Sequence, residues 1–72
     1  MTAKEHAALP HSVLVTRDGN YYVGEVVDWP GCMTQGDTVA ELFEMIDEVK
    51  VLWAEHCIEH GIEIPPPKPR DA

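Results

Sequence analysis

Three sets of side chains in this sequence could do chemistry. The first is His56, Cys57 and His60, in which the two histidines lie four positions apart and so share one face of a helix. Imidazoles at this spacing can chelate zinc, but a structural zinc site needs four ligands. Histidines also interact well with the dipole at the end of a helix, and a cysteine can simply fill the core. We therefore predict no metal site.

The second set is acidic. A two-metal nuclease needs several carboxylates that converge on magnesium ions. Asp28 and Asp37 fall in expected turns, and Glu41 is placed to cap a helix, so each has a structural explanation. We predict no catalytic residue and no enzyme; a metal-dependent nuclease is the least favoured alternative.

The third set is Cys32 and the aromatic residue near it. Cys32 would be a nucleophile only beside a base and in an electropositive setting, and His11 is the one histidine that could approach it across strands. Because the chain is acidic, we expect a buried structural thiol and no cofactor. Trp29, next to Pro30 on a turn, has two equal interpretations: it anchors a partner, or it covers the edge of the core.

Composition limits the class of protein. The chain has 72 residues, with 13 Asp and Glu against five Lys and Arg, a formal net charge of −8. Such a surface repels nucleic acid and attracts basic partners. We see no disulfide framework, no apolar run long enough for a membrane helix and no signal peptide, so we expect one cytoplasmic domain, 1–72. Its small core favours self-association.

Local patterns predict three strands. Ser12–Arg17 is rich in β-branched residues, and Asp18-Gly19 forms a turn into the alternating segment Tyr21–Val27. Pro30-Gly31 fits the centre of a type II turn, and Cys32–Gln35 is a short third strand. These elements predict a small antiparallel sheet.

The second strand separates into two faces. Because the set Tyr21, Val23, Glu25 and Val27 contains a carboxylate, we expect the other set, Tyr22, Gly24 and Val26, to face the core. Nothing else in the chain covers the first set. Val23 and Val27 are therefore expected to meet a partner, with a second copy of the chain and C2 symmetry as the default.

An amphipathic helix is predicted from Thr38 to His60. Asp37 or Thr38 caps its start with Glu41 in a capping box, and Gly61 ends it in the left-handed conformation. Its apolar stripe comprises Val39, Leu42, Phe43, Ile46, Val49, Trp53 and Cys57. Acidic residues fall mainly outside this stripe.

The ends of the chain have weaker patterns. We expect a flexible start at 1–10, a short fourth strand at Ile62–Ile64, and a proline-rich tail at 65–72. The fourth strand could pair within its own sheet or with a neighbour's. The expected fold is α+β, in the order β-β-β-α-β, with one helix on one face of the sheet and a right-handed connection to the fourth strand.

These elements resemble the HicB family of antitoxins between Asp18 and Pro67. The matching residues are Asp18-Gly19, Tyr22-Val23-Gly24-Glu25-Val26, Asp28, Pro30-Gly31-Cys32, Thr34-Gln35-Gly36-Asp37-Thr38, Glu41, Glu48, Trp53, Ile64-Pro65 and Pro67. The resemblance implies a partial ribonuclease-H-like fold that lacks nuclease activity. It also implies a protein that forms dimers or larger assemblies and blocks a small basic RNA-cleaving toxin of the HicA type.

The sequence departs from the family pattern in two ways. Leu42 and Val49 stand where alanine is common, and Lys50 stands where the family has an apolar residue. Many members also carry a C-terminal DNA-binding domain, whereas this sequence ends at Ala72, so we expect no autonomous DNA binding.

We therefore expect a non-catalytic antitoxin of a type II toxin–antitoxin system. The expected toxin contacts are Asp28, Trp29, Glu44, Asp47 and Glu48. The alternative is an orphan structural or regulatory oligomer of the same fold that has no toxin partner.

Overall fold

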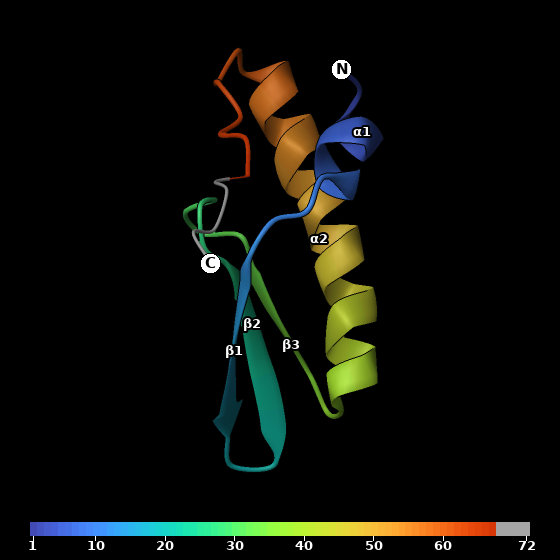
Figure 1. The fold of residues 1–72 in the computed structure, drawn as a ribbon, viewed down its shortest axis with the longest axis vertical. Helices are drawn as coiled ribbons and strands as arrows, with labels where there is room; N and C mark the ends of the chain where they lie inside the picture. The colour runs from blue at the N-terminus through green and yellow to red at the C-terminus, as the bar shows by residue number, and fades with distance from the viewer. Residues whose placement is uncertain (68–72) are drawn as a thin grey trace.

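The computed structural model describes residues 1–67 of the chain, and in them a small sheet packs against a long helix. The elements are α1 (Ala3–Ala8), β1 (Val13–Asp18), β2 (Tyr21–Val26), β3 (Met33–Gly36) and α2 (Val39–Glu59). The strands form one antiparallel sheet in the order β1-β2-β3. α2 runs along the sheet against β2 and β3, and α1 packs on α2 (Figure 1). The predicted α+β class is confirmed.

Both predicted turns form. Gly19, the first of two residues between β1 and β2, has a φ of 64°, as a type II′ hairpin requires. In the second turn, the Cys32 amide donates to the Trp29 carbonyl at 3.0 Å, and Gly31 has a φ of 80°. This is the predicted type II turn, because Gly31 occupies its third position. The turn brings β3 back antiparallel to β2.

The predicted fourth strand is wrong, because residues 62–64 form no strand. The Ile62 amide instead donates to the Cys57 carbonyl at 2.8 Å, and the Gly61 amide donates to the Ile58 carbonyl at 3.3 Å. With Gly61 at a φ of 66°, these bonds make a Schellman motif that ends α2. Ile64 then packs against the core, so residues 62–67 form a strap. We expected a proline-rich tail over 65–72; its residues 68–72 lie outside the described part.

α1 is an element that the sequence analysis missed. The Thr2 hydroxyl accepts a hydrogen bond from the Glu5 amide at 3.2 Å, and the Glu5 carboxylate accepts one from the Thr2 amide at 2.8 Å. This capping box is visible in the sequence as a Thr followed three positions later by a Glu. We overlooked it because α1 buries no residue and so has no hydrophobic periodicity. The observed order is therefore α-β-β-β-α.

α2 starts and ends where predicted, but its buried line is rotated. Thr38 rather than Asp37 is the N-cap, and its hydroxyl accepts a hydrogen bond from the Glu41 amide at 3.1 Å. Val39 and Phe43, placed in the predicted stripe, are 46% and 43% exposed. The buried residues of α2 are Leu42, Ile46, Lys50, Ala54 and Cys57. The difference arises because α2 packs against β2 and β3 and not against β1.

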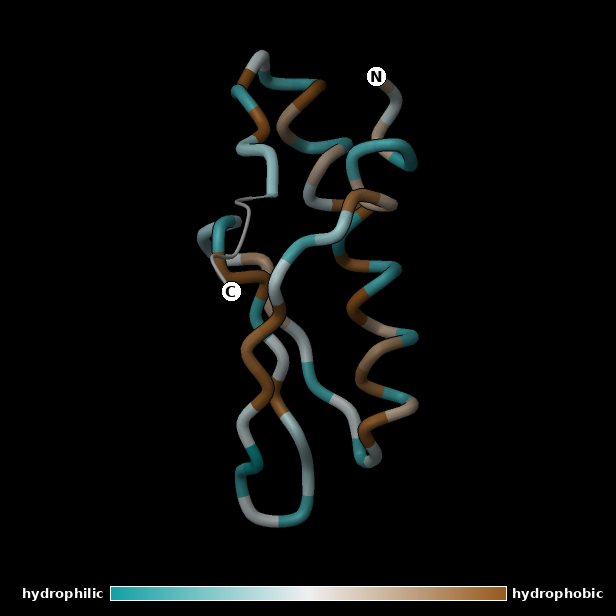
Figure 2. Tube along the Cα trace, in the orientation of Figure 1, coloured by the Kyte–Doolittle hydropathy of each residue, from teal (hydrophilic) through white to brown (hydrophobic). Residues whose placement is uncertain are grey.

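Two glycines allow α2 to approach the sheet closely. A Cβ atom on Gly24 would lie 2.9 Å from Cδ1 of Ile46, and one on Gly36 would lie 2.7 Å from the backbone nitrogen of Leu42. Gly24 and Val26 are buried beneath α2, which confirms the predicted core face of β2. Figure 2 shows hydrophobic and hydrophilic residues alternating along α2, as expected for a helix with one buried side. Within residues 1–67, neither helix has both the length and the apolar character needed to cross a membrane.

Candidate partner-binding surfaces

Trp29 lies in the core and is fully buried. Its ring stacks on Trp53, with centroids 4.6 Å apart and planes at 10°, and it also contacts His11, with centroids 4.3 Å apart. The Trp29 indole nitrogen donates to the Pro65 carbonyl at 2.9 Å, so Trp29 ties the strap to the β2–β3 turn. Of the two interpretations of Trp29, the structure supports the cover over the core. In this conformation Trp29 offers no exposed surface to a partner.

The acidic residues expected to contact a partner lie on two elements. Glu44, Asp47 and Glu48 are exposed on α2, whereas Asp28 is half-buried in the turn between β2 and β3. Helical spacing places Glu44, Asp47 and Glu48 on neighbouring turns of one side of α2. The structure therefore groups three of the four carboxylates and leaves Asp28 on a separate element.

Apolar side chains accompany the carboxylates on the outer side of α2. Asp47, Glu48, Val51 and Leu52 line an open groove of about 460 Å³. Leu52 is 64% exposed, although its neighbours on the sheet side of α2 are buried. The sequence analysis missed Leu52 as a surface residue, but its position outside the apolar stripe was the available signal. This outer surface combines an apolar floor with a negative rim.

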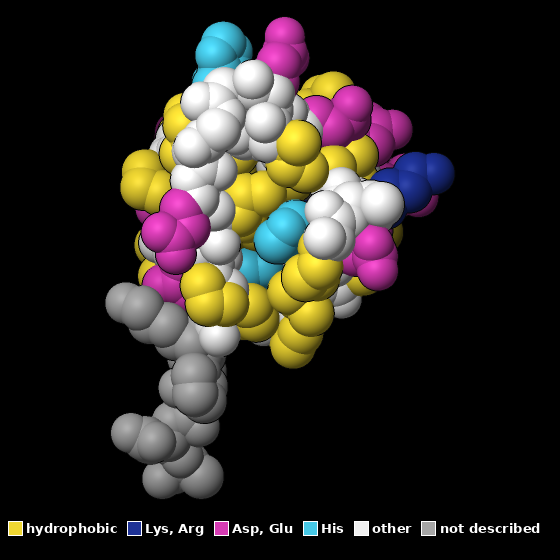
Figure 3. Space-filling model, turned by 90° about the horizontal axis from the view of Figure 1, so that it is seen from above, with side chains coloured by type: hydrophobic (Ala, Val, Ile, Leu, Met, Phe, Trp, Pro, Cys, Tyr) yellow, Lys and Arg dark blue, Asp and Glu magenta, His cyan; other side chains and the backbone are white. Residues whose placement is uncertain are grey.

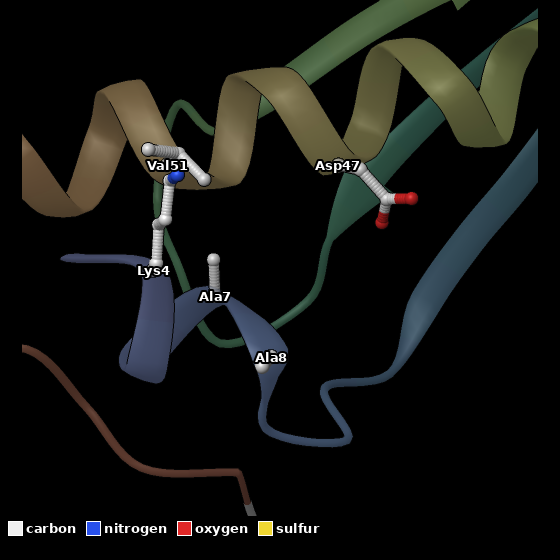
Figure 4. Close-up of a pocket in the computed structure, with 5 residues that line it drawn as sticks. All are labelled: Lys4, Ala7, Ala8, Asp47 and Val51. Carbon is white, nitrogen blue, oxygen red and sulfur yellow. The ribbon is translucent and has the colours of Figure 1, made fainter. Parts of the chain in front are cut away.

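A second groove runs between α1 and α2. Its volume is about 390 Å³, and it is lined by Lys4, Ala7, Ala8, Asp47 and Val51. In Figure 4, Lys4 extends from α1 toward Val51, and Asp47 projects from α2 farther along the groove. Asp47 thus lines both grooves, which makes it the central carboxylate of this surface.

The sheet face turned away from α2 carries exposed apolar residues. The strand register places Leu14, Glu25 and Met33 in one row and Thr16, Val23 and Gln35 in the next. Leu14 is 58% exposed and Met33 is 48% exposed, while Val23 is half-buried. Val27, directly after β2, is 50% exposed. Leu14 and Met33 were missed, although the alternation within their strands could have placed them.

The two cysteines are buried thiols. Burial raises the pKa of Cys32 to about 11, and burial also raises the pKa of Cys57. The Cys32 sulfur lies 4.0 Å from the Val49 carbonyl, to which it donates a weak hydrogen bond. Since the thiolate is the nucleophile, burial disfavours the reactive form of both groups at neutral pH.

The exposed histidines form a pair at the end of α2. The ring centroids of His56 and His60 lie 4.4 Å apart. Across residues 1–67, no three His, Cys, Asp or Glu side chains gather as a metal-binding group. Asp28 and Asp37 are therefore not part of such a group either. The pair therefore has no third ligand from its own chain within the described part.

Comparison with known proteins identifies the family. The family model described as "HicB_like antitoxin of bacterial toxin-antitoxin system" matches residues 11–72. The chain belongs to this HicB-like antitoxin family. The UPF0150 protein Ta0767 of Thermoplasma acidophilum is 36% identical over 58 residues, which cover 79% of this chain and 84% of that relative. No solved structure gives a significant match.

Family membership confirms the resemblance found in the sequence and implies a role in a toxin–antitoxin system. It also suggests a role other than catalysis. The match begins at residue 11, so α1 lies before the matched region, whereas Asp47 and Val51 on the other wall of its groove lie within it.

Proposed function

We propose that this chain is the non-catalytic antitoxin of a type II toxin–antitoxin system and neutralises a small basic mRNA-cleaving toxin of the HicA type. The observation that carries the proposal is the outer side of α2, where exposed carboxylates surround an apolar groove. Glu44, Asp47 and Glu48 provide the negative charge, and Val51 and Leu52 provide the apolar floor.

This arrangement suits a cationic protein surface for two physical reasons. The net charge of −8 steers a basic partner toward the chain and raises its association rate. Burial of Leu52, 64% exposed in the free chain, then supplies affinity that does not depend on charge. Asp28, half-buried on the β2–β3 turn, would be a separate contact. Bound there, the antitoxin would act by covering the RNA-cleaving surface of the toxin.

We also propose that the chain self-associates through the sheet face that α2 does not cover. Leu14, Val23, Val27 and Met33 supply apolar area on that face. Burial of such a patch is favourable, and a two-fold dimer is the simplest closed assembly. Because α2 lies on the opposite face of the sheet, two paired copies would both keep their acidic helices free for toxin.

Co-expression with the adjacent genes tests the toxin assignment. We expect a small basic protein encoded beside this gene to co-purify with the chain and to lose its RNA-cleaving activity in the complex. The double variant Glu44→Gln/Asp47→Asn should weaken that complex about five- to tenfold at low salt, since each exposed ion pair contributes up to about 1 kcal/mol.

The matched control is Asp37→Asn/Glu63→Gln, which removes the same charge from exposed sites outside α2. It should change the affinity much less. If the neighbouring genes encode no small basic protein, the toxin assignment is refuted. If the two double variants weaken the complex equally, the assignment of the α2 surface as the toxin-binding site is refuted.

One observation favours the alternative of an orphan structural or regulatory module. Lys50 is buried to 7% exposure at a position where the resemblance leads us to expect an apolar residue. A chain that self-associates but neither binds nor counteracts any neighbour-encoded protein would support this second function.

A further inference from the structure

His11, between α1 and β1, is a half-buried residue whose two ring nitrogens are shielded from solvent. Both ring nitrogens are inaccessible to solvent, and neither has a hydrogen-bond partner of ordinary geometry within the described residues; the His6 backbone supplies only a weak contact. Figure 3, seen from above, shows histidine side chains in a hollow bordered by hydrophobic side chains. Leaving a buried donor or acceptor unpaired is unfavourable, so a fold that retains such a group calls for a physical explanation.

Three elements place charged or titratable groups around this ring. α2 contributes Lys50, the β2–β3 turn contributes Asp28 and the Trp29 ring, and α1 contributes His6. Burial first, and then the positive charge of Lys50, lower the pKa of His11 below its usual value of 6.5. The His6 carbonyl and the Asp28 carboxylate raise the pKa and the His6 side chain lowers it slightly, but burial and Lys50 prevail. The folded chain therefore favours neutral His11.

The segment that precedes His11 is lightly held. α1 has six residues and no buried side chain, and a helix this short is not stable in isolation. Its attachments are its packing on α2, the contact of Ala3 with the core, and the Lys50 ammonium that donates to the Leu9 carbonyl at 3.5 Å. Ser12, in contrast, is fixed to the sheet, because its carbonyl accepts a hydrogen bond from the Val27 amide at 3.0 Å. Residues 1–11 can therefore move about Ser12 without breaking the strand pairing.

We propose that His11 is a proton-sensitive clasp that holds residues 1–11 against the core. Neutral His11 packs on Trp29 and closes the segment. A proton on its ring adds a second cation beside Lys50, at nitrogen atoms that solvent does not reach, and the segment then detaches and exposes Trp29 and the side of α2 that α1 covers. This makes closure of the N-terminal segment dependent on pH.

The sign of the pH dependence follows from the lowered pKa. At pH values well above 6.5, His11 is neutral in both the folded and the unfolded chain, and its packing contributes fully to the free energy of unfolding. As the pH falls through this value, the unfolded chain takes up the proton first and folding becomes less favourable. Once the pH is below the pKa of His11 in the folded state, protonation of His11 causes no further change in the free energy of unfolding.

Proton NMR of the wild-type chain tests the clasp directly. The ring protons of His11 should titrate with a midpoint below the usual histidine pKa of 6.5. Nuclear Overhauser effects between the His11 and Trp29 rings, and between Lys50 and Leu9, should be present at pH 7.5 and lost below that midpoint. A midpoint at or above 6.5, or ring contacts that persist below the midpoint, would overturn the proposal.

A matched pair of variants provides the second test. His11→Phe keeps an aromatic ring against Trp29 but cannot be protonated, whereas His60→Gln removes an exposed histidine. When the pH is lowered from 7.5 to 5.5, the urea concentration at the unfolding midpoint should decrease for the wild type and for His60→Gln. The decrease should be clearly smaller for His11→Phe. An equal fall in all three would refute the clasp. If His11→Phe does not fold, the wild-type titration decides alone.

Discussion

Gly36→Ala should destabilise the fold strongly, because β3 and the first turn of α2 touch backbone to backbone. A Cβ atom at this position would lie 2.7 Å from the Leu42 nitrogen and 2.9 Å from the Leu42 Cα. Real Cβ atoms essentially never come this close to other heavy atoms, and backbone cannot rotate aside. The start of α2 would have to move away from the sheet, and the fully buried Leu42 side chain would move with it.

The magnitude follows from two opposing terms. Overpacking a close contact typically destabilises by about 1–3 kcal/mol, and the rigid obstacle at Gly36 places the effect near the upper end. Alanine restricts the unfolded chain more than glycine does, and this stabilises the folded state by about 0.4–1 kcal/mol. The net loss is then about 2 kcal/mol. At about 0.05–0.15 kcal/mol per residue, a chain of 72 residues has roughly 4–11 kcal/mol of stability, so the variant still folds.

Urea unfolding at one fixed protein concentration, followed by the fluorescence of Trp29 and Trp53, measures this loss. With a denaturant slope of about 1 kcal/mol per molar, the midpoint should fall by about 2 M. Gly24→Ala is the matched control, because its Cβ would meet Cδ1 of Ile46 at 2.9 Å, and this flexible end can rotate away. We expect a loss of about 1 kcal/mol there. Equal midpoints for the two variants would refute the argument from backbone contact.

Three further results are expected. Leu42→Ala, at a fully buried site, should lower the free energy of unfolding by about 2–5 kcal/mol, and Phe43→Ala, 43% exposed, by less than about 1 kcal/mol; similar urea midpoints would contradict the observed rotation of α2. Thr38→Ala removes the hydroxyl that accepts from the Glu41 amide and should cost about 1 kcal/mol, measured by thermal unfolding; an unchanged transition would argue against this cap. Iodoacetamide at pH 8 should leave Cys32 unmodified in the native chain and label it in urea, as mass spectrometry would show, because burial raises its pKa to about 11. Equally fast labelling in both states would contradict this.

The features predicted correctly depend on near neighbours in the chain. Gly19 and Pro30-Gly31 form their turns because backbone conformation at these residues is restricted locally. Thr38 and Gly61 bound α2 for the same kind of reason, since each satisfies backbone groups a few residues away. The family resemblance rests on local motifs of this kind, and the family model that matches residues 11–72 confirms it.

The candidate surfaces were predicted in part. Helical spacing was enough to group Glu44, Asp47 and Glu48, and strand alternation was enough to place Val23 opposite the core. Trp29 could not be assigned, because its burial depends on Trp53, which is distant in sequence, and on Pro65 in the strap. The exposure of Leu52 was indicated by its position outside the predicted apolar stripe, but the groove beside it is a feature of the tertiary structure.

The sequence by itself determined the hairpin, the type II turn and the extent of α2, because hydrogen bonds between residues close in the chain define them. Only the tertiary structure decided which side of α2 is buried, that Lys50 lies inside, and that His11 meets Trp29. Those outcomes depend on how closely Gly24 and Gly36 let α2 approach the sheet and on how α1 and the strap fold back over its end. Contacts of this kind join residues distant in the sequence, and no local pattern encodes them.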